Sequence, residues 1–270
     1  MSAFYTLFAF LNIGIGLLLV LIPPWEGWAS TWVNFLALVN GALWGSGLLL
    51  FFWGLRYMDA SRATPIFHTF PVFAAILAVF FLNEELSLIH WLAIVIVVLG
   101  AGSINVGKHR GGSLSGQNRA SILVFLGAVL HGVATVNNKF VLDHMDFWNV
   151  FALRQLTMGV SCLIPGFRRG ILTKLREQLA DRQGLVLIVF GEGLLAFFGV
   201  ALTLLALKLG PVSLVATVIA SRPLFVLVFS VLFSTKFWPV LNEPLKRDTI
   251  VIKALSTVMI VGGIAILGLA

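Results

Sequence analysis

The segment HTFPVFAAILAVFF, residues 68–81, places a proline near the start of an otherwise continuous apolar run. A second segment, ASRPLFVLVFSVLF at residues 220–233, carries its proline at the same place, 152 positions further along the chain. Each segment lies in a longer apolar run, 64–82 and 212–234, of about the length that a membrane-spanning helix needs. The recurrence of one unusual segment predicts that the chain consists of two related halves.

The shift of 152 residues also aligns other residues that chance would rarely pair. In one ungapped register it matches two pairs of glycines, the prolines and a polar serine: Gly41 with Gly193, Gly47 with Gly199, Pro71 with Pro223, and Ser61 with Ser213. After a short insertion, LNEEL (82–86) aligns with LNEPL (241–245). We interpret this pattern as an internal repeat.

The composition indicates that most of the chain lies in a membrane. Of its 270 residues 59% are hydrophobic and only 11% are charged, far from the balance of soluble domains. Runs of about 20 apolar residues predict a polytopic, all-α bundle of nine spanning helices. We expect them near 3–22, 32–55, 64–82, 89–107, 120–140, 149–165, 185–207, 212–234 and 250–269.

The loops between these spans carry their charges asymmetrically. Nearly all loop Lys and Arg residues fall on one side of the membrane, whereas the other side holds Lys208 and acidic residues such as Glu84 and Asp143. The positive-inside rule predicts that the basic loops are cytoplasmic. Because the basic residues are scattered among short loops, they do not indicate nucleic-acid binding.

The two halves of the repeat are expected to be inverted. The spans that contain Pro71 and Pro223 are five helices apart, so they cross the membrane in opposite directions. Inverted repeats related by a pseudo-two-fold axis in the membrane plane form a site near the midplane that opens to each side in turn. This topology favours a carrier over a channel or an enzyme.

The stretch WGLRYMDASRATPIFHTFPVFAAILAVFFLNEELSLIHWLAIVIVVLGA (53–101) resembles the third to fifth helices of an EamA-type domain of the drug/metabolite transporter superfamily. The resemblance is carried by four motifs: Gly54-Leu55-Arg56-Tyr57, Pro71-Val72-Phe73, the acidic turn Glu84-Glu85, and Gly100. Weaker similarity covers nearly all the remaining chain. The resemblance implies ten helices in two repeats of five.

This chain opens with MSAFYTLFAFLNIGIGLLLVLIPP, which resembles the second helix of the family, so we expect the first helix to be absent. The expected organisation is a first repeat at 1–107, equivalent to helices 2–5, a glycine-rich polar linker at 108–119, and a second repeat at 120–270, equivalent to helices 6–10. The family's usual ten-helix form has both termini in the cytoplasm, which would place the basic loops outside. The charge bias predicts the opposite orientation.

Glu192 is the sharpest candidate site residue. An ionisable group inside the membrane costs several kcal/mol unless it is paired or hydrated, so each one suggests a functional site. Glu192 lies between Gly191 and Gly193, and its equivalent in the first half is Asn40. We predict that Glu192 and Asn40 bind substrate and that Glu192 also carries the coupling proton. A helix–helix hydrogen bond is the alternative.

Further candidate binding residues lie in other spans. His131, Thr135 and Asn138 share one helical face, which we expect to look into the bundle. Trp44 suits stacking on an aromatic or cationic substrate. Arg222 either pairs with Glu192 or neutralises an anionic substrate.

His68, which shares a helical stripe with Pro71, is a further candidate substrate-binding residue. The remaining proline, basic and glycine residues suggest mainly structural roles. Pro71 and Pro223 are predicted to kink their helices. Lys139 and Arg154 are expected to snorkel to the interface, with substrate contact as the alternative. The glycines of two groups are predicted to let helices approach closely, namely Gly41 with Gly45, and Gly191 with Gly193.

The sequence therefore predicts a secondary active or facilitative transporter of small organic solutes, namely metabolites, amino acids or drugs. We expect an exporter that works by alternating access in the plasma membrane. A transport-inactive interaction or regulatory subunit, a truncated fragment and a lipid flippase are the alternatives. The common ATP-binding, zinc-protease and hydrolase motifs do not occur, so no catalytic residue, metal site or cofactor is predicted. The expected partners are a small-molecule substrate and the lipid bilayer, and a homodimer is left open.

Overall fold

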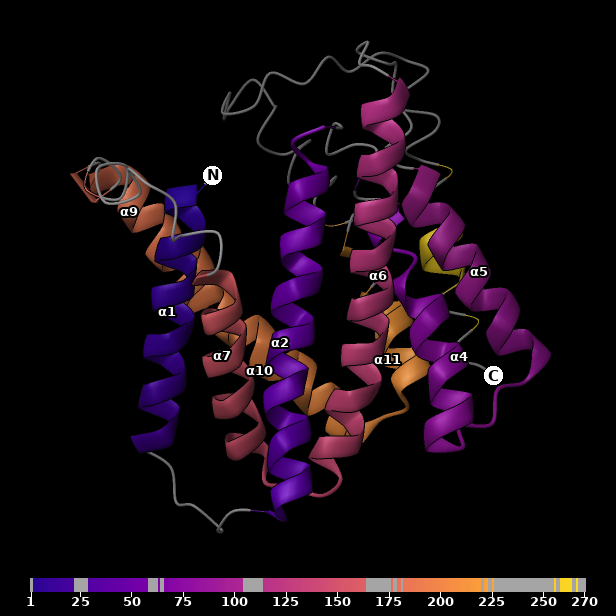
Figure 1. Ribbon diagram of the computed structural model, residues 1–270. Coiled ribbons are helices and arrows are strands. Elements are labelled where there is room, and N and C mark those ends of the chain that lie inside the picture. The colour runs from indigo at the N-terminus through magenta and orange to yellow at the C-terminus, as the bar shows by residue number, and fades with distance from the viewer. Residues whose placement is uncertain are drawn as a thin grey trace, which may run out of the picture. The chain divides into compact units, whose positions relative to one another are not determined.

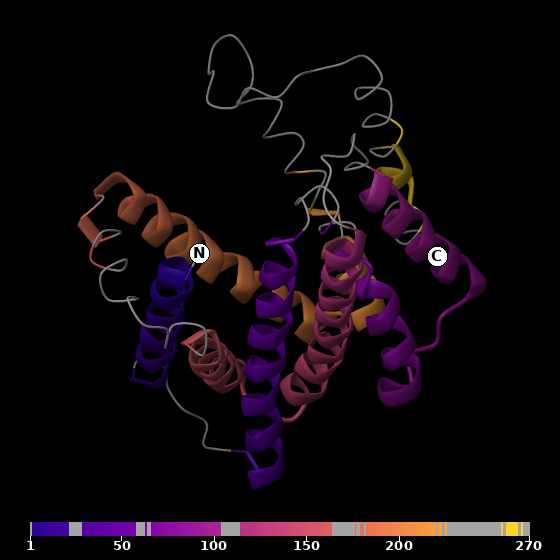
Figure 2. The same cartoon turned by 45° about the horizontal axis from the view of Figure 1, so that its top comes forward.

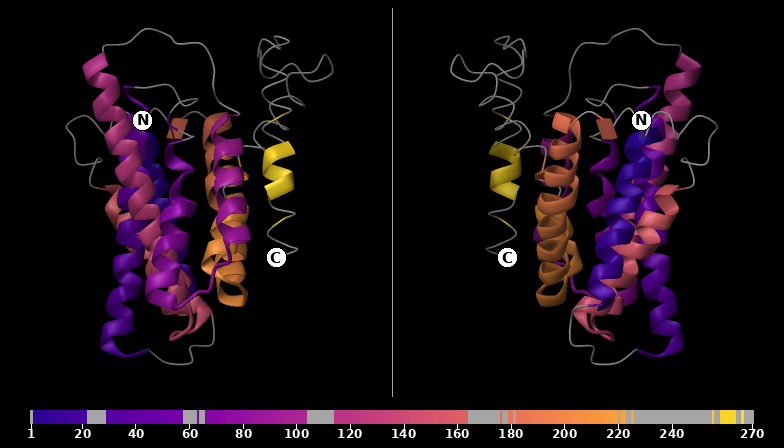
Figure 3. Two further views of the ribbon diagram at one scale, coloured as in Figure 1. Left: turned by 90° about the vertical axis from the view of Figure 1, so that its right-hand side faces the viewer. Right: turned by 90° about the vertical axis from the view of Figure 1, so that its left-hand side faces the viewer.

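The computed structural model describes residues 2–21, 29–57, 63, 66–103, 114–163, 176, 179–180, 182–219, 221–222, 225, 255, 258–263 and 266. Every regular element in these ranges is helical, and Figure 3 accordingly shows coiled ribbons only. The predicted all-α class is confirmed.

The helices follow the predicted spans in order (Figure 1). They are α1 (Ser2–Leu21), α2 (Thr31–Gly54), α4 (Phe70–Leu82), α5 (Leu88–Ser103), α6 (Leu114–Leu142), α7 (Phe147–Leu163), α9 (Arg182–Ile188), the π-helix η2 (Val189–Leu195), α10 (Ala196–Leu209) and α11 (Val212–Ile219). Helical residues 258–263 lie within the ninth predicted span. Helix α6 begins inside the segment that the sequence suggested as a linker.

The lengths of the helices and the apolar side chains on their surface both fit a membrane protein. Within the described ranges, the helices Thr31–Gly54, Asn118–Leu142 and Gly184–Leu209 are long and apolar enough to span a bilayer. Large apolar side chains are exposed on the helices, among them Leu18, Phe80 and Leu202. A soluble protein rarely exposes so many such groups, whereas hydrocarbon chains solvate them well.

The chain forms two compact units, each assembled from both halves of the sequence. Unit 1 comprises Met1–Leu49 and Val133–Gly210, and unit 2 comprises Leu50–Gly132 and Pro211–Ala270. The two units therefore do not coincide with the two halves of the sequence repeat: each unit combines segments from both halves. The repeat boundaries remain a prediction.

In unit 1, α1 packs along α7 (Figure 1). Their contact contains the buried apolar residues Phe8, Ala9, Met158 and Cys162. The helices approach closely because Gly159 has no side chain: a Cβ there would lie 2.8 Å from the carbonyl oxygen of Ala9. Small residues at helix contacts are the usual way to pack helices in lipid, where no hydrophobic effect drives them together.

In unit 2, α11 packs against α4 and α5. The first part of α6 approaches α4 at Gly132, where a Cβ would lie 2.8 Å from the Cβ of Phe73 and 3.1 Å from the carbonyl oxygen of Phe70. This close approach brings the neighbouring residue His131 against the start of α4.

The third predicted span is not one continuous α-helix. Its α-helical part, α4, begins at Phe70, and Pro71 lies in the first turn. A proline is favourable there because its missing N–H would have no helical partner anyway. The preceding residues His68 and Thr69 form a turn, in which the Thr69 hydroxyl donates to the Ile66 carbonyl oxygen over 2.7 Å. Pro223 lies outside the described residues.

Helices α9, η2 and α10 run into one another as one helical path (Figure 2). The π-helical part contains Gly191, Glu192 and Gly193. The prediction that these glycines bring helices together is wrong for the described part of the chain. A Cβ on Gly191 would meet nothing within 4 Å there, and one on Gly193 would meet only Val189, at 3.9 Å and in the same π-helix. The sequence offered no sign of the π-helical turn that occupies this position.

Candidate functional site

Two glycines of α2 bring it against α7 in unit 1. A Cβ on Gly45 would lie 2.7 Å from the Cβ of Ser161 and 3.1 Å from the carbonyl oxygen of Met158. A Cβ on Gly41 would overlap the backbone of Arg154 itself. The predicted role of this glycine pair is confirmed, and its consequence is that Arg154 meets the face of α2 that carries Trp44.

Arg154 is buried and lies over the ring of Trp44. Its guanidinium carbon is 4.4 Å from the ring centre, and the residue is only 2% exposed. Trp44 also packs against the apolar cluster at the α1–α7 contact. The expectation that Arg154 snorkels to the interface is wrong, because the indole ring holds its charge inside the bundle by a cation–π interaction.

A chain of side-chain hydrogen bonds continues from Arg154 to α1. The Arg154 guanidinium donates to Gln155 Oε1 over 3.5 Å, and Gln155 Nε2 donates to Asn12 Oδ1 over 2.9 Å. Asn12 Nδ2 in turn donates to the carbonyl oxygen of Phe8 over 2.8 Å. Sequence reasoning missed Asn12 and Gln155. The available signal was their polarity within otherwise apolar spans.

Asn40 connects α2 to α6. Its Nδ2 donates to the carbonyl oxygen of Ala134 over 2.7 Å, and Asn137 Nδ2 donates back to the carbonyl oxygen of Leu36 over 3.0 Å. Such reciprocal bonds hold two helices together in an apolar medium. The other amide atom of Asn40, Oδ1, has no hydrogen-bond partner among the described residues.

Four buried or partly buried residues of unit 1 belong to these contacts or lie one turn from them, and we call them the polar strip. It runs from Arg154 on α7, through Trp44 and Asn40 on α2, to Asn138 on α6. Asn138 lies one turn beyond Ala134, the residue that accepts the bond from Asn40. Asn138 is buried, and its Oδ1 also has no hydrogen-bond partner in the described part of the chain.

A second group of candidate residues lies in unit 2. The ring of His131 contacts Phe70 and Phe67 edge to face, with ring centres 4.5 and 5.1 Å apart. His68 lies beside the same two phenylalanines, at 6.3 Å from each ring centre. The structure thus brings His68 and His131 together around one aromatic pair.

His131, Thr135 and Asn138 are all buried, as predicted from their shared helical face on α6.

For Glu192 and Arg222, two further predicted site residues, the structure gives the helical position of the backbone. The backbone of Glu192 lies in η2, which packs beside α1, and its side chain lies outside what the structure describes. Arg222 is helical and exposed. The predicted pairing between Glu192 and Arg222 stays a prediction.

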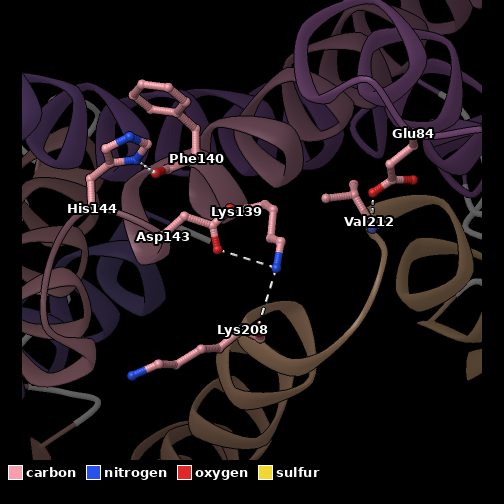
Figure 4. Close-up of polar contacts among 7 residues, drawn as sticks. All are labelled: Glu84, Lys139, Phe140, Asp143, His144, Lys208 and Val212. Carbon is pink, nitrogen blue, oxygen red and sulfur yellow. Dashed lines mark hydrogen bonds and ion pairs between the residues drawn. The ribbon is translucent and has the colours of Figure 1, made fainter.

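Lys139 serves the packing of unit 1 (Figure 4). Its ammonium group lies 3.2 Å from Asp143 Oδ1 and donates over 3.2 Å to the carbonyl oxygen of Lys208, in the last turn of α10. A cation is favourable there because the last carbonyl groups of a helix carry partial negative charge. The side chain is partly exposed, which agrees with its expected place at the interface.

In unit 2, the carboxylate of Glu84 caps the first turn of α11, as the ammonium group of Lys139 meets the last turn of α10 in unit 1. One carboxylate oxygen accepts a hydrogen bond from the backbone N–H of Val212 (Figure 4). The other accepts from the N–H and the hydroxyl of Ser213, over 3.2 and 2.6 Å. An anion at a helix N-terminus satisfies N–H groups that have no partner within the helix. This contact gives the acidic turn after α4 a structural role.

An apolar helical bundle with a buried cation and buried amides fits a polytopic membrane protein, in which buried ionisable groups suggest a functional site. The model of the EamA-like transporter family matches residues 1–106 and 118–269, so the chain belongs to that family. The expected resemblance is confirmed.

Comparison with individual proteins agrees with this assignment. The chain is similar to the "Uncharacterized transporter in cobO 3'region" of Sinorhizobium sp, with 39% identity over 78 residues, which cover 29% of this chain and 54% of that protein. The match thus spans about half the length of that curated relative. A solved structure described as "Crystal structure of protein" aligns with a TM-score of 0.67 at 18% identity, covering 99% of this chain and 85% of the other. That likeness concerns the fold alone.

Proposed function

We propose that this EamA-family transporter moves small organic solutes, namely metabolites, amino acids or drugs, out of the cell across the plasma membrane. The observation that supports the proposal is the burial of Arg154 over Trp44 in the interior of unit 1. A charge held inside a membrane bundle costs several kcal/mol, so buried charges in membrane proteins generally serve transport or coupling.

The proposed mechanism is alternating access. The sequence repeat that pairs Pro71 with Pro223 supports it, because two inverted halves can exchange conformations and open one central site to each side in turn. Glu192 is the proposed carrier of a coupling proton. Its place in a π-helical turn supports this role, since such turns occur frequently at functional sites.

The direction of transport is tested in cells. The metabolites inside and outside cells that express the protein are compared with those of cells that lack it. The proposal predicts that expression raises at least one small polar solute in the medium and lowers it in the cytoplasm. Unchanged distributions across all detected solutes, with the protein present in the membrane, contradict export.

Transport itself is tested with the purified protein in liposomes of phosphatidylethanolamine and phosphatidylglycerol. Liposomes preloaded with the solute found in the cell experiment should take up its labelled form by exchange, and empty liposomes should not. Absence of exchange would favour a membrane interaction or regulatory subunit.

A further inference from the structure

The consecutive helices α10 and α11 are each bonded, at the end where the chain joins them, by a charged side chain from another part of the fold (Figure 4). In unit 1, the ammonium group of Lys139 donates to the carbonyl oxygen of Lys208 over 3.2 Å. In unit 2, the carboxylate of Glu84 accepts from the N–H groups of Val212 and Ser213. Lys208 and Val212 are four positions apart in the chain, so both contacts act on one connection. We call these contacts the α10–α11 clamp.

The start of α11 depends on Glu84 because it has no cap of its own. The residue before the helix is Pro211, whose side chain has no oxygen atom to accept from the N–H groups of the first turn. Glu84 replaces that cap from the turn after α4, and accepts three hydrogen bonds, including one of 2.6 Å from the Ser213 hydroxyl. The first turn of α11 is therefore capped only while the turn after α4 lies against it.

The backbone after α4 holds Glu84 in a fixed position. Asn83 ends the helix in the left-handed conformation, with φ 53° and ψ 35°, which asparagine tolerates better than most residues. The N–H of Glu84 then donates to the carbonyl oxygen of Ala78 over 3.3 Å. Because α4 carries Glu84 in this way, a movement of α4 away from α11 breaks all three bonds together.

Both contacts of the clamp can break and form again at small cost. The side chain of Lys139 is 19% exposed, and that of its ion-pair partner Asp143 is 42% exposed. Glu84 is partly exposed as well. Water can therefore replace each partner when a contact opens, and exposed ion pairs contribute little to stability. Such contacts suit a connection that has to open and close in every transport cycle.

The sequence repeat contains both partners of the Glu84 contact a second time. The register that aligns Ser61 with Ser213 also aligns, after the short insertion, Glu243 of LNEPL with Glu84 of LNEEL. In an inverted repeat, equivalent elements belong to opposite sides of the membrane and exchange roles during transport. Residues 61 and 243 lie outside the described residues, so the inference below concerns Glu84 and Lys139 alone.

We infer that the α10–α11 clamp is a gate. It closes the side of the membrane on which the sequence places Glu84 and Asp143, which we call the acidic face, and both of its contacts break when the transport site opens to that face. Glu84 and Lys139 are positioning residues: they set the fraction of the protein that is closed at the acidic face. This inference rests on the proposed function, and it adds the residues that control one step of the cycle.

The first test follows the exposure of α11 itself. Thr217 lies one turn beyond Ser213 and is fully buried, and Thr217→Cys in a Cys162→Ala background carries the chain's only cysteine. A membrane-impermeant maleimide is added to vesicles of either orientation. Glu84→Gln should speed labelling from the acidic face by about 10-fold, because it weakens three hydrogen bonds to a charged acceptor. Lys139→Ala should speed it by about 2- to 5-fold, since its ion pair is partly exposed.

Two matched controls leave the clamp intact. Glu85→Gln removes the same charge from the exposed neighbour of Glu84, which accepts none of the three bonds. Lys208→Ala removes an exposed side chain but keeps the backbone carbonyl group to which Lys139 donates. Both should label within about 2-fold of the parent protein, since surface substitutions away from special contacts have small effects.

The second test separates a gate from a purely structural cap. Exchange of the solute found in the cell experiment is measured from each face, in liposomes of phosphatidylethanolamine and phosphatidylglycerol that are sorted by protein orientation. A larger fraction open to the acidic face binds solute better there and worse on the opposite face. The KM of Glu84→Gln should therefore fall at the acidic face and rise at the opposite face, each by at least about 2-fold. A folding defect alone lowers the amount of active protein and leaves both KM values unchanged.

Two results overturn the inference while the proposed function stands. One is that Glu84→Gln exchanges solute while Thr217→Cys is labelled at the parent rate. The other is that labelling rises equally from both faces, or that both KM values change in the same direction. Lys139→Ala, the milder change, gives the same readouts if Glu84→Gln does not reach the membrane. If the wild-type protein exchanges no solute of any class, the proposed function fails and the inference fails with it.

Discussion

The contact between α1 and α7 makes a quantitative prediction at Gly159. A Cβ there would lie 2.8 Å from the carbonyl oxygen of Ala9 and 3.0 Å from the backbone nitrogen of Ile13. Ordinary contact begins at 3.4 Å, so Gly159→Ala forces the two backbones apart by about 0.6 Å. Backbone atoms cannot rotate away as a side chain can, so the strain falls on the whole helix pair. Overpacking of this kind costs about 1–3 kcal/mol.

The replacement also makes a stabilising contribution to the free energy of unfolding, because alanine is more favourable in a helix than glycine by at most about 1 kcal/mol. The control Gly14→Ala isolates that contribution: Gly14 lies in α1, and a Cβ there meets nothing within 4 Å among the described residues. We therefore expect Gly159→Ala to be less stable than Gly14→Ala by roughly 1–3 kcal/mol. The assay is the unfolding midpoint in mixed dodecyl maltoside and SDS micelles. A Gly159→Ala protein as stable as the control refutes the close α1–α7 contact.

Further predictions concern single side chains. Glu84→Gln should destabilise the protein by about 1–2 kcal/mol, because it removes the anion at the start of α11, whereas the exposed neighbour Glu85→Gln should change stability by less than about 0.5 kcal/mol. The micelle assay checks both, and equal effects would contradict the capping role of Glu84. Trp44→Leu should raise the KM for transported solute at least several-fold, because Arg154 loses the ring that positions it; an unchanged KM in liposome exchange would remove Trp44 from the site. Lys139→Ala should cost at most about 1 kcal/mol, since its ion pair is partly exposed, and a larger loss in the micelle assay would contradict that estimate. Glu192→Gln should abolish the pH dependence of exchange, and a pH profile like that of the wild type would exclude Glu192 from coupling.

Features that depend on local pattern were predictable from the sequence. The apolar runs predicted the helices because a span must be long and apolar whatever it packs against. Gly41 and Gly45 were predicted as packing residues because glycine is otherwise unfavourable within a helix. The same reasoning was wrong at Gly191 and Gly193, where a Cβ would meet no other helix among the described residues. The inward face of α6 followed from the spacing of His131, Thr135 and Asn138.

Features that depend on contacts between distant segments were not predictable in the same way. Arg154 lies near the start of its span, so snorkelling was the natural expectation, and only the approach of α2 explains its burial over Trp44. The role of Glu84 required knowledge that the start of α11 lies beside the turn after α4. The polarity of Asn12 indicated that its side chain needs a hydrogen-bond partner, but the sequence could not identify that partner as Gln155.

The central claim is that the polar strip opens to each side of the membrane in turn. It is tested most directly by placing a cysteine at Asn40 in a Cys162→Ala background and labelling it with a membrane-impermeant maleimide in vesicles of either orientation. The account predicts that Asn40→Cys is labelled from both sides, and that transported solute slows labelling from each. Labelling from one side only, in a variant that still exchanges solute, would contradict alternating access at this site.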